Sequence, residues 1–244
     1  MKFFGKMLCA LMFALCVNPA GAFAEGEDGL YEGWGYGFQL GGGGVFPTSS
    51  LRDDFKGAFI FTGGLTGEYR NVRLKADVAF GQPSLKNDNP YAVYDTQLRN
   101  LQINGKSSAS LLMVGIQAGY TVARVGRLSI TPMVGGFFSR IGWTLNNITW
   151  SKDAQGVDVF TIANSQDTHE SHFSWMASID FDIKVHNSLT HSLTNSDRQA
   201  YYTSSVRISP FIARASYKNL VPAVKGNYIG ITVAYSGMMH LLNY

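Results

Sequence analysis

The sequence predicts an all-β protein: a closed antiparallel up-and-down transmembrane β-barrel of eight strands, with ten strands as the alternative. Two patterns predict this fold. After Ala24, stretches of about ten to fourteen residues alternate large apolar side chains with small or polar ones. Between these stretches, short and long polar connections take turns along the chain. A tilted strand needs about 9–11 residues to cross a bilayer, with lipid on one face and the barrel interior on the other, so both patterns are typical of a membrane barrel.

Residues 72–80 show the alternation most clearly. One face carries mostly large apolar side chains and the other carries charged or small ones, namely Val72, Leu74, Ala76, Val78 and Phe80 against Arg73, Lys75, Asp77 and Ala79. The same period predicts further strands at about 33–46, 57–69, 110–122, 128–143, 173–186, 202–215 and 227–236.

The connections between these strands fall into two classes. The short turns are 70–71 and 123–127, and the longer polar loops are 47–56, 82–109, 145–172 and 216–226. Outer-membrane barrels have short periplasmic turns and long external loops, so we expect the longer class outside the cell. Residues 187–199 are long for a periplasmic turn, which is why ten strands stay open as the alternative.

We expect the bulky face of each strand to meet lipid. Alternation alone also fits a soluble barrel of the lipocalin type, whose apolar face points inward. The interior of an eight-stranded barrel is just wide enough for side chains to fill it. The face of Gly, Ala, Ser and Thr suits that interior, and the face rich in Trp, Tyr and Phe does not. The aromatic residues also gather near the strand ends, as interfacial girdles do.

Residues 1–24 have the features of a cleaved signal peptide, which leaves 25–244 as the outer-membrane barrel domain. Lys2 and Lys6 precede an apolar run, and a small-x-small cleavage site ends at Ala24. These features predict export from the cytoplasm.

The cysteines and the charge balance exclude several classes of protein. Cys9 and Cys16 both lie in the leader, so the barrel domain has no thiol for a disulfide or a metal site. A lipoprotein anchor at either cysteine is disfavoured, because a bulky leucine precedes each one. After Ala24, 18 basic residues face 17 acidic ones, whereas a nucleic-acid binder needs a basic surplus. We therefore expect no nucleic-acid partner.

The leader, the glycine-aromatic first strand, the alternating strands and the aromatic last strand resemble the small outer-membrane β-barrel proteins of Gram-negative bacteria, of the OmpA-barrel or porin-family type. In the last strand, Tyr228, Gly230, Val233 and Tyr235 are similar to the family's assembly signal, although nine residues follow it here. The resemblance implies a monomer in the cell outer membrane, in contact with outer-membrane lipid and lipopolysaccharide. It also implies assembly by the barrel-assembly machinery and an extracellular ligand whose identity stays open.

The inward face carries charges of both signs. Four acids are expected to face four bases across the lumen, namely Glu68, Asp77, Asp180 and Asp182 against Arg73, Lys75, Lys184 and Arg207. Unpaired charges in a narrow interior are costly, so we expect a paired network that plugs the lumen. The alternative is the constriction of a channel.

Chemistry beyond these charges has little support in the sequence. His172 and Ser174 are two residues apart and are superficially similar to the His–Ser pair of lipid A deacylases, but no acid is assigned beside them. The histidines at 169, 172, 186 and 191 lack the spacing of a metal site. Gly41 to Gly44 precede no helix, so they do not form a phosphate loop. We expect no catalytic residue, metal or cofactor.

The predicted function is a structural or surface-interaction role through the external loops 82–109 and 145–172, because loops on a rigid scaffold carry specificity. Two alternatives remain, a narrow passive diffusion channel and a lipid-modifying outer-membrane enzyme.

Overall fold

The computed structural model describes residues 34–86, 92–95, 100–104, 108–191, 199–217 and 224–241. The predicted leader, residues 1–24, lies outside these ranges. Within them, no helix combines the length and the apolar character needed to cross a bilayer.

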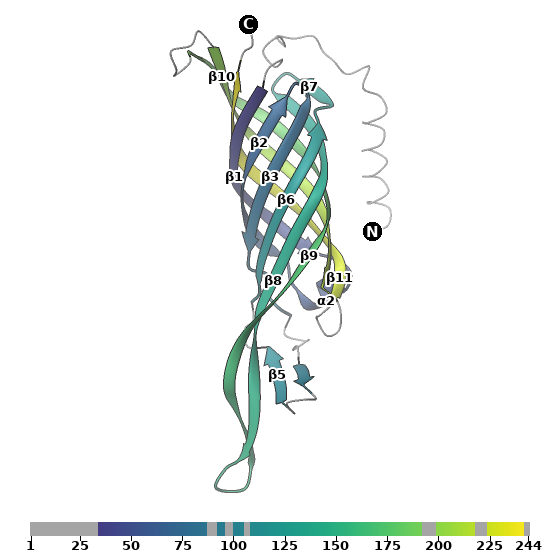
Figure 1. Ribbon diagram of the computed structural model, residues 1–244, viewed down its shortest axis with the longest axis vertical. Helices are drawn as coiled ribbons and strands as arrows, with labels where there is room; N and C mark the ends of the chain where they lie inside the picture. The colour runs from purple at the N-terminus through teal and green to yellow at the C-terminus, as the bar shows by residue number, and fades with distance from the viewer. Residues whose placement is uncertain are drawn as a thin grey trace.

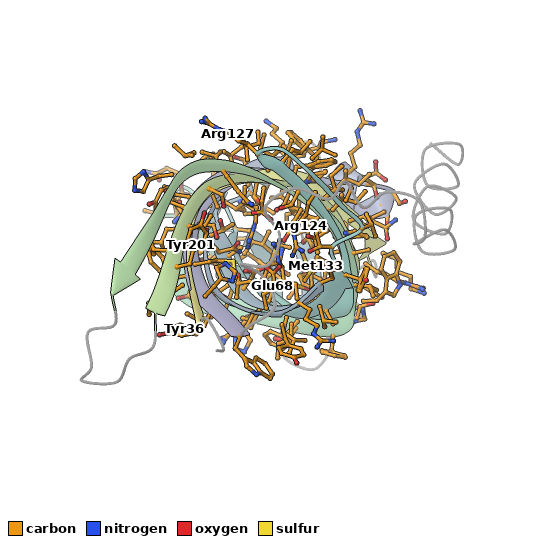
Figure 2. The ribbon with its side chains drawn as sticks, turned by 90° about the horizontal axis from the view of Figure 1, so that it is seen from above. Tyr36, Glu68, Arg124, Arg127, Met133 and Tyr201 are labelled. Atoms are coloured by element: carbon orange, nitrogen blue, oxygen red, sulfur yellow. The ribbon has the colours of Figure 1, made fainter. Side chains whose placement is uncertain are left out.

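Eight strands close into one barrel, which confirms the predicted fold class and the first expected strand count. Antiparallel pairs join each strand to the next around the ring, and β11 pairs with β1 to close it. Figures 1 and 2 show the barrel from the side and from above. In ring order the strands are β1 (Trp34–Pro47), β2 (Ala58–Tyr69), β3 (Val72–Gly81), β6 (Ser110–Tyr120), β8 (Leu128–Lys152), β9 (Asp158–His191), β10 (Gln199–Tyr217) and β11 (Val224–Leu241).

The ten-strand alternative is wrong, because the remaining described strands do not enter the ring. The short strands β4 (Ala92–Asp95) and β5 (Asn100–Asn104) form a hairpin, and β5 pairs with the part of β8 beyond the barrel. Strand β7 (Ala123–Val125) pairs with the start of β8. Strands cover both ends of the inner connection expected at 187–199, since β9 runs to His191 and β10 begins at Gln199.

The expected loop 145–172 is instead a long β-hairpin, the largest departure from the sequence prediction. β8 and β9 stay paired from Leu128–Ile183 out to Lys152–Asp158, and Figure 1 shows them projecting far beyond the barrel. A turn at 153–157 joins them, in which the Asp153 carboxylate accepts the Gln155 and Val157 N–H groups. The expectation failed because residues 145–172 lack the sustained apolar alternation by which the other strands were predicted.

The outer surface of the barrel is a continuous apolar belt, as expected for the lipid side. Apolar side chains of seven of the eight strands are exposed there, including Phe38, Phe61, Leu65, Leu74, Val78, Val114, Ile116, Val134, Phe173, Ile183 and Val233. On the eighth strand, β10, the outward Ile208 is half-buried. Trp34 and Tyr69 lie with ring centroids 4.7 Å apart near one end, and the Arg70 guanidinium lies over the Tyr69 ring. This belt and its aromatic edge are the features that place a barrel in a bilayer.

The hairpin marks the external end of the barrel. β1 starts and β11 ends at the opposite end, where the two-residue turn at 70–71 also lies (Figure 1). Short turns belong to the periplasmic side and long extensions to the outside. We call the lumen near the turn at 70–71 its periplasmic half and the lumen near the hairpin its external half.

A short helix closes the external mouth. Helix α2 (Ser50–Asp54) follows β1, and its Leu51 is fully buried together with the next apolar residue, Phe55. Leu85, from the chain after β3, is buried beside them. Hydrogen bonds from Thr48 to Asn227 and from Ser50 to Lys225 hold this segment against β11.

Candidate functional site

The periplasmic half of the lumen holds a connected set of charged side chains, the luminal charge network. Seven of the eight residues expected there are joined by ion pairs, and Arg124 joins them: Glu68, Arg73, Lys75, Asp77, Asp180, Asp182, Arg207 and Arg124. They come from β2, β3, β7, β9 and β10. The alternation of each strand turns them inward.

Arg73 is the centre of this network. Its side chain is buried, and its two terminal nitrogens lie within ion-pair distance of three carboxylates. Nη2 lies 3.1 Å from Glu68 Oε2, and Nη1 lies 2.5 Å from Asp182 Oδ2 and 3.9 Å from Asp180 Oδ2. One guanidinium from β3 therefore ties β2 to β9 across the barrel interior.

Arg207 ties the opposite wall to the same acids. Its Nε donates to Asp182 Oδ1 at 2.6 Å, and its Nη1 donates to Gln39 Oε1 at 2.7 Å and to Thr66 at 3.2 Å. Asp182 thus accepts from two guanidinium groups, one on each side. Each charge-assisted bond of this kind is stronger than a neutral one.

Lys75 lies on the side of the network that is nearer the external half of the lumen. Its Nζ lies 3.0 Å from Asp180 Oδ1 and 3.4 Å from Asp77 Oδ2. Ser209 donates to Asp180 at 2.8 Å, and the Gln39 amide donates to Asp77. The polar groups that surround these charges compensate for the water they lose on burial.

Sequence reasoning missed Arg124 of this network. Arg124 Nη2 lies 2.8 Å from Glu68 Oε1, and its Nη1 donates to Asn71 at 2.6 Å. Figure 2 shows Glu68 and Arg124 inside the ring and Arg127 outside it. Arg124 belongs to an expected turn, where no alternation indicates direction. Lys184 is half-buried on β9, two residues after Asp182.

The external half of the lumen is filled differently. Apolar side chains from most of the strands meet those of the α2 segment in one buried cluster: Val45, Leu51, Phe55, Ile60, Leu85, Ala109, Leu111, Met113, Phe137, Ile141, Trp143, Phe211, Ala213, Ala215, Tyr217 and Tyr228. The Tyr217 hydroxyl donates to Ser139 at 3.0 Å and lies 3.1 Å from the Tyr228 hydroxyl. The expectation of a uniformly small and polar inner face is therefore wrong for this half.

A small cavity separates the two halves. Its volume is about 50 Å³, and Lys75 and Asp77 line it together with Met113, Phe137 and Phe211. One or two water molecules fill a space of this size. The luminal charge network and the apolar cluster thus follow one another along the barrel axis, with only this small cavity between them.

The four residues of the expected assembly signal do not share one face of β11. Tyr228 and Gly230 face the interior, whereas Val233 and Tyr235 are exposed on the outer surface. The strand continues past Tyr235 to Leu241, so the signal lies inside the last strand. Its recognition by the assembly machinery stays a prediction.

The histidine-rich segment lies on β9 at the external end of the barrel. His172 and Ser174 are half-buried and face inward, as expected, and Glu170 is buried on the same face two residues earlier. His169 is exposed on the outer face. Among the described residues, no group of three or more His, Cys, Asp or Glu side chains is arranged to hold a metal.

No family model and no curated protein matches this sequence. Several solved structures are similar to the chain, and three of them are described here. The attachment invasion locus protein Ail of Yersinia pestis shares 10% identity, with 84% of this chain and 99% of that chain covered and a TM-score of 0.41. Neisserial surface protein A (NspA) shares 10%, with 88% and 99% covered and a TM-score of 0.35. The outer membrane protease OmpT of Escherichia coli shares 11%, with 86% and 97% covered and a TM-score of 0.33.

The closed ring of eight strands, the exposed apolar belt and the filled polar and apolar interior together describe one kind of molecule. The chain has the fold and the outer surface of a small β-barrel that spans the outer membrane.

Proposed function

We propose that this protein is a surface-interaction protein whose contact element is the β8–β9 hairpin. The observation that carries the proposal is the length of these two strands. They stay paired as far as Lys152 and Asp158, well beyond the point where β10 stops pairing with β9. We call the part of the hairpin formed by residues 145–166 the arm. A barrel from which one long arm projects suits a protein that holds a binding element away from the membrane.

The arm also offers a free strand edge. Pairing of β9 with β10 ends at Met176, and among the described residues no strand pairs with that edge of β9 between Asp158 and Gln166. On the other side of the arm, β5 pairs with β8 at residues 145–148. An open edge presents unpaired N–H and C=O groups that an extended segment of a partner can join. A complement factor, a glycan-bearing surface protein or a secretion-machine subunit all fit this description.

The filled lumen supports this role over the channel alternative. The charge network and the apolar cluster occupy successive parts of the same narrow interior. A permeant ion meets buried Arg73 and Arg207 in one half and Phe137 in the other. The enzyme alternative has less support, because His172 and Ser174 face the lumen and lipid contacts the opposite face.

The test removes the arm and leaves the barrel intact. Thr144 and Asp167 are opposite one another, so an Asn-Gly turn that joins them replaces residues 145–166 without changing the register. Non-adherent Gram-negative cells that display the full chain are expected to bind at least one surface in a panel coated with matrix proteins, serum proteins or glycans. Cells that display the shortened chain are expected to lose this binding.

Two controls make the result specific. The shortened chain must still shift on unheated SDS gels, which shows a closed barrel. A second variant replaces only the turn at 153–157 with Asn-Gly and is expected to retain binding, because the free edge of β9 remains. Binding that survives removal of the whole arm contradicts the proposal.

A further inference from the structure

We propose that a groove on the outer surface, at the external rim, binds the phosphate groups of an outer-leaflet glycolipid. The groove has a volume of about 440 Å³. Arg214 and Lys225 supply its positive charges, and Trp175, Ser216, Asn227 and Ser49 complete the part used in this argument. We call it the rim groove.

The two cations of the rim groove lie on one face of adjacent strands. Arg214 of β10 is opposite Asn227 of β11, and Lys225 is opposite Ser216. Arg214 and Lys225 are therefore diagonal neighbours, and both are exposed. Diagonal pairs in an antiparallel sheet are about 7–8 Å apart at the backbone, within reach of one another for long side chains. A single phosphate fits between a guanidinium and an ammonium held at that spacing.

The backbone beneath these cations is held in place. The Thr48 hydroxyl donates to the Asn227 carbonyl at 3.0 Å and accepts its N–H at 3.0 Å. The Ser50 hydroxyl makes the same pair of bonds with Lys225, each 2.8 Å long. At Gly226, between them, a Cβ atom would collide with the Thr48 carbonyl oxygen, so glycine permits this close approach. The rim groove is thus a fixed surface rather than a loop.

The height of the groove on the barrel matches the lipid head groups. The next outward residues toward the membrane are Ile212 on β10 and Ile229 on β11, and the exposed Phe173 and Trp175 lie on β9. Arg214 and Lys225 therefore lie directly beyond the apolar belt. Tryptophan and the long basic side chains favour this interfacial level.

The charges around the groove favour an anion. No carboxylate is among the described residues that line the rim groove. A second outward groove of about 430 Å³, around Arg140 and His169, differs because Asp167 also lines it. Basic pockets at a bilayer surface attract anionic head groups. The external leaflet supplies phosphorylated glycolipid, whose sugar hydroxyls can bond to Ser216, Asn227 and Ser49.

The test measures lipid bound to the full-length protein by native mass spectrometry in detergent. The probes are bisphosphorylated lipid A, dephosphorylated lipid A, phosphatidylglycerol and inorganic phosphate. We expect bisphosphorylated lipid A to bind in a one-to-one complex and the other three to bind at least several-fold more weakly. A surface cation contributes about fivefold to affinity for an anionic lipid, so Arg214→Gln with Lys225→Gln is expected to weaken lipid A binding ~25-fold.

The matched control is Arg52→Gln, an exposed arginine of α2 at the same end of the molecule but outside the groove. It is expected to leave lipid A binding unchanged. All variants must keep their shift on unheated SDS gels. Equal binding by the double variant and the wild type overturns the proposal, as does equal binding of all anionic probes, which indicates unspecific charge attraction. The result does not depend on the hairpin, so it can fail without affecting the proposed surface-interaction role.

Discussion

The periplasmic half of the lumen is filled by ion pairs, whereas the external half is filled by apolar side chains and capped by α2. Arg73, Arg207 and Lys75 hold four carboxylates in the first half. In the second half, Leu51 and Phe55 insert among apolar side chains of the barrel wall. Two different interactions thus close one passage in series. The charge network is destabilised when one partner of an ion pair is removed, and the apolar cluster is destabilised when a buried side chain is shortened.

The largest effect is expected in the ionic half, from Arg73→Ala. The substitution leaves Glu68 and Asp182 without one of their cations inside the barrel. Removal of one partner from a buried ion pair costs about 3–5 kcal/mol. The temperature at which the folded form disappears from SDS gels is expected to fall sharply. Arg127→Ala removes the same charge from an exposed residue at the same end and serves as the control. Equal melting of the two variants would show that the charge network does not stabilise the barrel.

In the apolar half, Leu51→Ala is expected to destabilise the protein by about 2–4 kcal/mol, because a buried leucine leaves a cavity. Its signature differs from that of Arg73→Ala. The decrease in the free energy of unfolding caused by Leu51→Ala should be the same at low and high salt, since no charge is removed. Urea unfolding in detergent measures both variants at two salt concentrations. If the decrease at Leu51 depends on salt, charges also stabilise the external half, and the two halves do not differ as described.

The lipid belt provides a test of depth that is independent of the lumen. Ile116 is 67% exposed near the middle of β6, and Val125 is 64% exposed at the periplasmic turn. A lysine at mid-membrane costs about 2–4 kcal/mol and near an interface about 0–1. Ile116→Lys should therefore reduce assembly in vesicles, and Val125→Lys should assemble normally. Equal assembly of both variants contradicts the assignment of the outer face to lipid.

The smallest effect is expected from Tyr217→Phe. The substitution removes the hydroxyl that donates to Ser139 and contacts Tyr228 inside the external half. A single hydrogen bond contributes about 0.5–1.5 kcal/mol. Tyr36→Phe, on the outer surface, is the matched control. A loss at Tyr217 as large as that at Arg73 would mean that polar contacts stabilise both halves to a similar degree.

Much of the barrel could be predicted because lipid on one side and a narrow interior on the other impose a period of two. Residues 72–80 correspond to β3 within one residue, and Arg73, Lys75 and Asp77 face inward as expected. Beyond the barrel there is no contrast between lipid and interior, and there the prediction failed. The arm formed by β8 and β9 lacks a sustained apolar alternation, so the sequence predicted a loop for the segment 145–172.

The interior was harder to predict than the surface. Several large apolar side chains face inward, and only their place in the alternation indicates this direction. They are Ile60, Met113, Phe137 and Phe211. Each has at least one large neighbour in the sequence, so sequence reasoning assigned most of the bulky side chains to the lipid side. Arg124 was missed for a different reason: it lies in a connection, and its direction depends on the tertiary contact with Glu68.

Planar-bilayer recording of the purified full-length protein tests the central claim most directly, namely that two fillings in series close the lumen. The wild type is expected to show no stable openings. Leu51→Ala, which opens one half alone, is also expected to stay silent, because the charge network remains. Stable openings of the wild type, with an ion selectivity that changes in Arg73→Gln or Lys75→Gln, would contradict the account and make the protein a narrow channel.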